Sequence, residues 1–218
     1  MALLAVVIVS WNVRDLLARA LESLFADLDT SSIGSRVLVV DNASRDGSVE
    51  MLRSRFPRVE LIALERNLGF AGGNNVGLRA LGFSPSPRLP FSSPGDRERG
   101  RTGEGEFVLL LNPDTEVRPG GIRTLLDAIR ARPEAAVVTS RLSYADGSFQ
   151  HSSFRFPGLA QLCIDLFPVP SRLRETRLNG RYPRRWYSSG QPFEIDHPLG
   201  AVMLVRAEAI RQVGLLDE

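Results

Sequence analysis

The sequence contains no lysine, a single cysteine and only two histidines among its 218 residues. The lack of lysine excludes a Walker A phosphate loop, and the single Cys163 excludes an internal disulfide and a cysteine-based zinc site. His151 and His197 lie far apart in the sequence, which also argues against zinc. The net charge is only +2, so bulk electrostatics predict no nucleic-acid partner. What remains is an arginine-rich chain with 43% hydrophobic residues, enough for a packed core.

Long hydrophobic runs are also missing, because none reaches the ~18 residues that a membrane span needs. The apolar N-terminus, MALLAVVIVSW, lacks the basic start of a signal peptide. Polar residues follow at Ser10 and Asn12, before any cleavage site. We therefore interpret this stretch as a buried first strand and expect a cytoplasmic protein.

Two kinds of apolar segment alternate along the chain. Runs typical of buried strands occur at 3–9, 36–40, 59–64, 107–111, 136–139 and 200–205. Helical spacing predicts helices over 17–28, 74–81, 119–131 and 207–213. A further helix is predicted to run from a cap at Ser44 or Asp46 to Phe56. The alternation favours an α/β fold with a mostly parallel central sheet flanked by helices.

Four shorter patterns carry local predictions. Asn12 and Asp15 have the spacing of a helix capping box, and the glycines of 69–73 predict a turn. Residues 84–106 are dominated by proline, serine, glycine and charge, which indicates a flexible surface insertion. The pair Asp146-Gly147 indicates a hairpin, whereas 154–193 shows no assignable pattern.

Polar side chains follow directly after four of the predicted strands. They are Ser10 and Asn12, then Asp41 and Asn42, then Arg66 and Asn67, and finally Asn112 and Asp114. Right-handed crossovers place the carboxyl ends of parallel strands at one edge of a sheet, where ligands of open α/β sheets bind. The sequence therefore predicts that these side chains share one cleft.

Two carboxylates at this edge have both a structural and a functional interpretation. Asp41 is either a turn or helix cap or an acceptor of hydrogen bonds from a nucleotide base or ribose. Asp114 either caps the helix near Pro119 or coordinates Mg²⁺ or Mn²⁺, whose octahedron water and phosphate oxygens complete. The glycines of 69–73 lack the spacing of a dinucleotide fingerprint.

Five segments in order resemble glycosyltransferase family 2 and, within it, rhamnosyltransferase-like bacterial members. They are VVIVSWN, VLVVDNASRDGS, ERNLGFAGGNNVGL, VLLLNPDTEV and HPLGAVMLVRAEAIRQVGLLDE. The resemblance implies the GT-A nucleotide-diphospho-sugar transferase fold in a single domain over 1–218. It also implies a nucleotide-binding half at 1–140, with the insertion 84–106, and a partial acceptor-binding half at 141–218.

The resemblance assigns roles to individual residues. The nucleotide-sugar-binding residues that it implies are Ser10, Asn12, Asp41, Arg66, Asn67, Asn75, Asn112 and Asp114. The family's D-x-D metal motif corresponds to Asn112-Pro113-Asp114, so Asp114 is the sole carboxylate expected to hold Mg²⁺ or Mn²⁺. His197 and Gly200 are expected to shape the sugar and acceptor pocket.

The activity implied is inverting transfer of a sugar from a dTDP- or UDP-linked donor to a saccharide or lipid-linked acceptor in cell-envelope polysaccharide synthesis. The family's catalytic base lies beyond a stretch that ends here at Glu218, so we expect a truncated member that binds donor better than it turns it over. A non-catalytic nucleotide-sugar-binding fragment is the alternative, and an unrelated nucleotide-binding α/β enzyme is a third. Association with the inner face of the membrane and homodimer formation both stay open.

Overall fold

The structure is a computed structural model, which describes residues 4–84, 106–167, 170 and 179–218. It divides into two compact units, one of residues 1–138 with 203–218 and one of residues 139–202. Except for Ser84 and Glu106, the predicted insertion at 84–106 lies outside the described residues.

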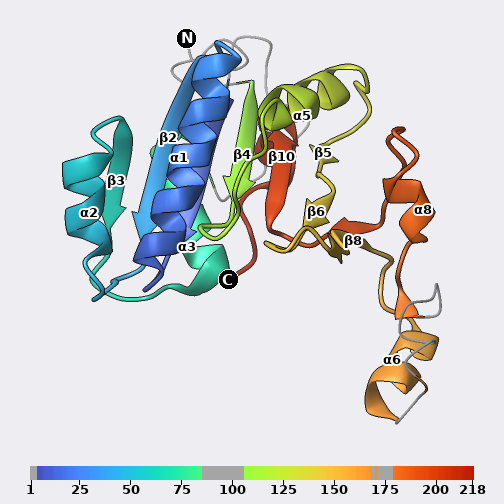
Figure 1. Ribbon diagram of the computed structural model, residues 1–218. Coiled ribbons are helices and arrows are strands. Elements are labelled where there is room, and N and C mark those ends of the chain that lie inside the picture. The colour runs from blue at the N-terminus through green and yellow to red at the C-terminus, as the bar shows by residue number, and fades with distance from the viewer. Residues whose placement is uncertain (1–3, 85–105, 168–169, 171–178) are drawn as a thin grey trace, which may run out of the picture. The chain divides into compact units, whose positions relative to one another are not determined.

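The first unit is built on a six-stranded sheet in the order β3-β2-β1-β4-β10-β5 (Figure 1). Four of its strands run parallel to one another: β1 (Leu4–Ser10), β2 (Ser35–Asp41), β3 (Val59–Ala63) and β4 (Phe107–Leu111). The other two, β10 (Val202–Arg206) and β5 (Val137–Val138), pair antiparallel. This confirms the predicted α/β fold with a mostly parallel sheet.

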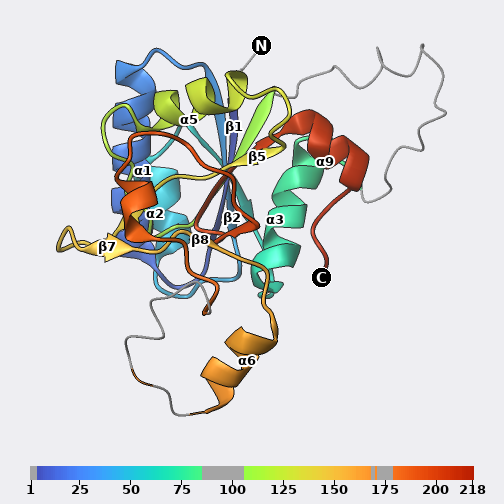
Figure 2. The ribbon, with the colours of Figure 1, turned by 90° about the vertical axis from the view of Figure 1, so that its right-hand side faces the viewer.

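Helices cover both faces of this sheet, as Figure 2 shows. One face carries α1 (Arg14–Thr30), α2 (Ser48–Arg55) and α5 (Gly121–Arg130). The other carries α3 (Gly69–Ala80) and α9 (Ala207–Val213). Because β1, β2 and β4 are covered on both faces, their side chains are almost all buried, which explains the continuous apolar runs in the sequence.

The glycine-rich segment forms the first half of α3, so the predicted turn at 69–73 is wrong. A Cβ atom on Gly73 would lie 2.6 Å from Val9 Cγ1, and one on Gly77 would lie 2.5 Å from Val7 Cγ1. These two glycines face β1 and let the helix backbone approach the sheet more closely than any side chain would permit. The glycines therefore serve close helix-sheet packing.

The predicted capping box at Asn12 and Asp15 is also wrong. Helix α1 begins at Arg14, with Val13 in the N-cap position and no hydrogen bond from the side chain of that cap residue. The backbone N–H of Arg14 instead donates to Asp46 Oδ2, at 2.8 Å, from the connection that follows β2. Sequence spacing suggested a local cap, whereas the cap comes from 32 residues away.

The second unit is a small assembly of short strands and helices. Strands β6 (Leu142–Ser143) and β7 (Phe149–Gln150) pair antiparallel, which confirms the predicted hairpin. Strands β8 (Ser153–Phe154) and β9 (His197–Pro198) pair likewise. The unit also contains α6 (Leu159–Leu166) and α8 (Arg184–Tyr187).

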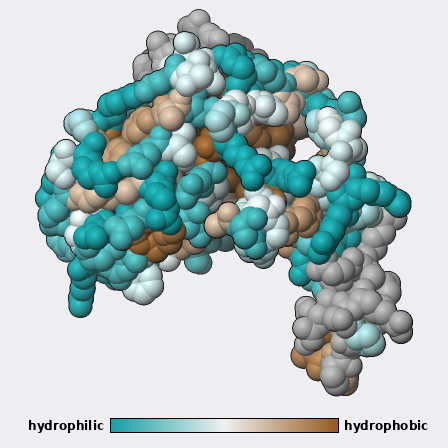
Figure 3. Space-filling view, in the orientation of Figure 1, coloured by the Kyte–Doolittle hydropathy of each residue, from teal (hydrophilic) through white to brown (hydrophobic). Residues whose placement is uncertain are grey.

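Helix α6 presents an apolar face to solvent. Leu159, Leu162 and Leu166 are 82%, 52% and 68% exposed, and the brown atoms at the lower right of Figure 3 mark this helix. Within the stretches of chain that the structure describes, none of the helices combines the length and hydropathy needed to cross a bilayer.

Candidate functional site

A cleft of about 370 Å³ opens in the first unit, at the carboxyl ends of its parallel strands. Its lining comes from the end of β1 and from the residues that follow four neighbouring strands: Val9 and Ser10 in β1, Trp11 and Val13 after it, Asn42 after β2, Asn67, Gly69 and Phe70 after β3, and Asn112, Pro113 and Asp114 after β4. The structure thus gathers four of the predicted site residues, namely Ser10, Asn67, Asn112 and Asp114, into one cleft.

Asp114 lies in this cleft with an uncommitted carboxylate. Its side chain is exposed and, among the described residues, has neither a hydrogen-bond nor an ion-pair partner. The structural alternative for Asp114 was a cap for the helix near Pro119. That helix, α5, starts at Gly121 and is capped by a different carboxylate, that of Asp27.

Asp27 comes from α1 and is only 3% exposed. Its carboxylate accepts hydrogen bonds from the backbone N–H groups of Gly120 and Ile122, the latter at 2.9 Å. These are two of the N–H groups that a helix start leaves without an intrahelical partner. Since Asp27 performs the capping, Asp114 stays available for a ligand.

We expect Asp27→Ala to lower the free energy of unfolding by about 2 kcal/mol, because it removes the cap of α5 and leaves two buried N–H groups unpaired. Urea denaturation measures the change. The matched control is Asp127→Ala on α5, where an exposed ion pair with Arg130 at 3.9 Å is worth about 0.5 kcal/mol or less. Equal effects of the two substitutions would contradict the capping role.

Two buried polar atoms at the ends of β1 and β2 have no partner among the residues that the structure describes. Ser10 and Asp41 are Cα partners on neighbouring parallel strands and are 0% and 1% exposed. Within the described residues, Ser10 Oγ and Asp41 Oδ1 receive no hydrogen bond, whereas Asp41 Oδ2 accepts one from Ser44 N at 2.9 Å. Buried polar groups are nearly always paired, so a ligand or an ordered water is expected to pair with these two atoms.

Asn42 connects two parts of the cleft, where the sequence placed it without assigning it a role. Its Nδ2 donates to Gly69 O at 3.0 Å, and its Oδ1 accepts from Leu68 N at 3.4 Å. Asn67 Oδ1 in turn accepts from Gly69 N at 2.7 Å. These bonds fix the start of α3 beside the cleft, and the only sequence signal for Asn42 was its place next to Asp41.

Two exposed aromatic side chains also line the cleft. Trp11, after β1, is 55% exposed, and Phe70, in the first turn of α3, is 47% exposed. Large exposed rings at a cleft are suited to stacking on a base or a sugar. Phe70 has no signal of its own in the sequence, because the glycines around it predict a turn and not a helix start.

Four predicted nucleotide-site residues are not among those that line the cleft. Asp41 lies beside it, buried at the end of β2, and Arg66 is exposed with no partner in the described part of the chain. Asn12 Oδ1 accepts a hydrogen bond from Arg45 N at 2.8 Å, so its side chain is engaged by the connection after β2.

Asn75 faces the C-terminal segment of the chain. It is 1% exposed, and its Nδ2 donates to Leu216 O and Glu218 Oε1 at 2.8 and 2.9 Å. Its Oδ1 accepts from Leu216 N at 2.9 Å. The hydrogen bonds from Asn75 and Arg79 lower the pKa of the exposed Glu218 carboxylate. Its amide is committed in this way, and Asn75 is not among the residues that line the cleft.

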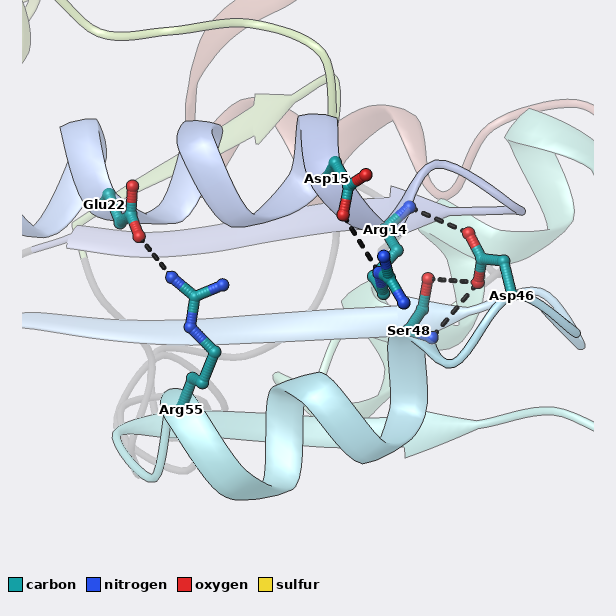
Figure 4. Close-up of polar contacts among 6 residues, drawn as sticks. All are labelled: Arg14, Asp15, Glu22, Asp46, Ser48 and Arg55. Atoms are coloured by element: carbon teal, nitrogen blue, oxygen red, sulfur yellow. Dashed lines mark hydrogen bonds and ion pairs between the residues drawn. The ribbon is translucent and has the colours of Figure 1, made fainter.

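Asp46 joins the starts of two helices beside the cleft (Figure 4). It accepts from Arg14 N, at the start of α1, and from the N–H and hydroxyl of Ser48, at the start of α2, at 3.1 and 2.6 Å. Partial burial tends to raise the pKa of Asp46, but the hydrogen bonds from Ser48 and Arg14 outweigh it and lower this pKa.

The other two predicted residues, His197 and Gly200, belong to the second unit. His197 is half-buried, and its ring stacks on Phe154 with centroids 5.7 Å apart.

The donor set in the cleft suits a hard divalent ion that brings most of its own ligands. Among the residues that the structure describes, no group of three or more histidine, cysteine, aspartate or glutamate side chains could enclose a metal. Mg²⁺ typically takes one or two carboxylates and fills its other positions with water and phosphate oxygens. Asp114, next to the amide of Asn112, fits this kind of ion.

The comparisons with known proteins agree with this geometry. The sequence model described as "Glycosyl transferase family 2" matches residues 5–81, which run from β1 to the end of α3. The N-acetylglucosaminyl-diphospho-decaprenol L-rhamnosyltransferase of Mycobacterium tuberculosis is 31% identical over 182 residues, covering 84% of this chain and 55% of that protein. The chain belongs to glycosyl transferase family 2. The matched segment supplies three of the four strand ends around the cleft.

A second curated relative of this family 2 chain is similar over most of the chain. The succinoglycan biosynthesis protein ExoO of Rhizobium meliloti is 29% identical, covering 88% of this chain and 51% of that protein. The chain therefore spans about half the length of the curated relatives that it matches.

Solved structures confirm the GT-A fold. The crystal structure of residues 1–349 of S. aureus TarS matches with a TM-score of 0.51 and 20% identity, covering 72% of this chain and 40% of that one. The same protein in complex with UDP-GlcNAc matches with a TM-score of 0.50 and 22% identity, covering 72% and 39%.

Proposed function

We propose that this family 2 protein is an inverting glycosyltransferase, which moves a sugar from a dTDP- or UDP-linked donor to a saccharide or lipid-linked acceptor in cell-envelope polysaccharide synthesis. The observation that carries the proposal is the convergence of Ser10, Asn112 and the uncommitted Asp114 on one cleft at the strand ends. The relatives support it, since one is named for L-rhamnosyl transfer to a diphospho-decaprenol and another for succinoglycan biosynthesis.

We assign the nucleoside to the side of the cleft next to β1 and β2. The unpaired Asp41 Oδ1 is an acceptor and Ser10 Oγ both donates and accepts, so together they suit the N3–H and carbonyl groups of uracil or thymine. The exposed rings of Trp11 and Phe70 provide apolar surface for the base or ribose. Arg66 and Asn67, after β3, are proposed to contact the ribose or diphosphate.

We assign the diphosphate to the β4 side of the cleft. Asp114, with Asn112 beside it, would hold Mg²⁺ or Mn²⁺, and the bound ion would supply positive charge against the departing diphosphate. Asn112 is placed to donate its amide hydrogens to a phosphate or sugar oxygen. Holding the leaving group here while an acceptor approaches the opposite face of the sugar would give inversion.

Removal of the acceptor's proton needs a second carboxylate or another base. Asp114 is the only carboxylate among the described residues that line the cleft, and its role with the ion leaves it unavailable as a base. The alternative function, binding of nucleotide sugar without transfer, is favoured by this same observation. His197 and Gly200 of the second unit remain the proposed sugar and acceptor residues.

The test is a thermal-shift panel of UDP, dTDP, CDP and GDP, with and without MnCl₂. We expect UDP or dTDP with Mn²⁺ to stabilise the protein, by about 2.7 kcal/mol at a ligand concentration 100 times Kd. Release of UDP or dTDP from the corresponding sugar donors, in the presence of a diphospho-lipid acceptor, then separates transfer from binding alone. If none of the nucleotides raises the unfolding temperature, the proposed function is wrong.

Contact with the inner face of a membrane and homodimer formation are proposed as secondary properties. The exposed leucines of α6 support the membrane contact, since an apolar face suits insertion among lipid headgroups.

A further inference from the structure

The connections after β1 and β2 are joined by a set of hydrogen bonds between their backbones and side chains. Asn12 N donates to Ser44 Oγ at 2.9 Å, and Arg45 N donates to Asn12 Oδ1 at 2.8 Å. Arg14 N donates to Asp46 Oδ2 at 2.8 Å, as Figure 4 shows. We call these three contacts the clasp. It ties together two loops that are separated by more than 30 residues in the sequence.

Ser44 links the clasp to the buried carboxylate of Asp41. Its hydroxyl accepts the hydrogen bond from Asn12, while its own N–H donates to Asp41 Oδ2 at 2.9 Å. That bond engages one carboxylate oxygen and leaves the other, Oδ1, buried and without a partner in the described chain. The direction in which Oδ1 faces is therefore set by the position of Ser44, which Asn12 helps to hold.

Asn12 also fixes the other wall of the cleft. Its chain neighbours, Trp11 and Val13, both line the cleft, although Asn12 does not. Its backbone has φ 54°, in the left-handed region, where asparagine is one of the few non-glycine residues that are well tolerated. The clasp holds this backbone at residues 12 and 14, directly after Trp11.

On the basis of the proposed function, we infer that Asn12 is a positioning residue that sets base selectivity by orienting Asp41 and Trp11 without touching the ligand. A fixed acceptor at Asp41 Oδ1 favours a pyrimidine that carries N3–H, as uracil and thymine do, over cytosine, whose N3 is itself an acceptor. When the clasp is broken, the carboxylate of Asp41 can turn, and the preference for uracil or thymine over cytosine falls. The acceptor side of the reaction is not involved.

The experiment measures Kd for UDP and CDP with Mn²⁺ by calorimetry, together with the unfolding temperature, in the wild type and in four variants. Asn12→Ala removes the acceptor of the Arg45 N–H, and Ser44→Ala removes the acceptor of the Asn12 N–H. Asn12→Asp keeps an acceptor oxygen and a residue type that tolerates positive φ. Asp15→Ala, which removes an exposed partner of Arg14, is the matched control.

We expect the wild type and Asp15→Ala to prefer UDP over CDP by about tenfold or more, since a site built around a hydrogen bond rejects the analogue that lacks it. Asn12→Ala and Ser44→Ala are expected to reduce this ratio to about threefold or less, and Asn12→Asp to restore it. A purely structural role would lower the unfolding temperature and leave the ratio unchanged.

A ratio unchanged in both Asn12→Ala and Ser44→Ala would overturn the inference and leave the proposed function intact. If Asn12→Ala does not fold, Ser44→Ala and Asn12→Asp decide the matter by the same ratio. A wild type that binds none of the nucleotides would overturn the proposed function and this inference with it.

Discussion

Replacement of Asp114 with alanine is expected to weaken Mn²⁺-dependent binding of UDP or dTDP by about a hundredfold or more. Asp114 is the only carboxylate among the described lining residues, so its loss leaves the ion with an amide, water and phosphate oxygens. Replacing a residue that only supports a metal ligand typically lowers metal affinity by about 10–100-fold, so the loss of the ligand itself should cost at least as much. Calorimetric titration of UDP at fixed Mn²⁺ measures the effect.

The matched control for Asp114 is Glu116→Ala. Glu116 is an exposed carboxylate two residues away and pairs with Arg19 at 3.1 Å, outside the cleft lining. We expect this variant to bind nucleotide like the wild type, and Asp114→Asn to behave like Asp114→Ala, because the amide keeps the shape and loses the charge. Binding of UDP by Asp114→Ala within threefold of wild type, still dependent on Mn²⁺, would show that the ion is held elsewhere.

Replacement of Gly77 with valine is expected to lower the free energy of unfolding by about 3 kcal/mol, and it has the largest expected effect on stability. A Cβ atom at this position would lie 2.5 Å from Val7 Cγ1, 3.3 Å from Val7 Cγ2 and 3.5 Å from Val40 Cγ2. Val7 and Val40 are both 0% exposed and have no room to move away. The clash exceeds the small gain in helix propensity that comes from removing a glycine.

Urea denaturation of Gly77→Val measures this cost, with Gly34→Val as the control. Gly34 lies before β2, and a Cβ atom there would meet no atom within 4 Å. We expect the control to change stability by about 0.5 kcal/mol or less. Wild-type stability in Gly77→Val would mean that α3 can move away from the sheet without cost, contrary to the close packing described above.

The central part of the fold could be predicted from the sequence because its signal is local. The segments of β1 and β4 are uninterrupted apolar runs, and both are buried in the sheet as expected. The cleft followed from topology, since strands that run parallel must end at one edge. For this reason Ser10, Asn112 and Asp114 were correctly expected to lie near one another.

Partners that lie far away along the chain could not be predicted. Asp27 looks in the sequence like any acidic residue of a helix, yet it is buried against N–H groups more than 90 residues away. Asn75 is predicted from its motif to belong to the nucleotide site, and the sequence gives no sign that its side chain bonds to Leu216, 141 residues later. The partners of these two side chains cannot be determined from sequence spacing. They depend on what packs against the face of α1 or α3 that each residue occupies.

The three hydrogen bonds between Asn75 and the segment 216–218 have a practical consequence for protein engineering. They anchor the final residues on α3, whose first turn supplies Gly69 and Phe70 to the cleft. A recombinant form that stopped before Leu216 would leave a buried carboxamide with no partner, on the same helix that borders the cleft. Expression boundaries and cleavable tags should therefore be placed after Glu218.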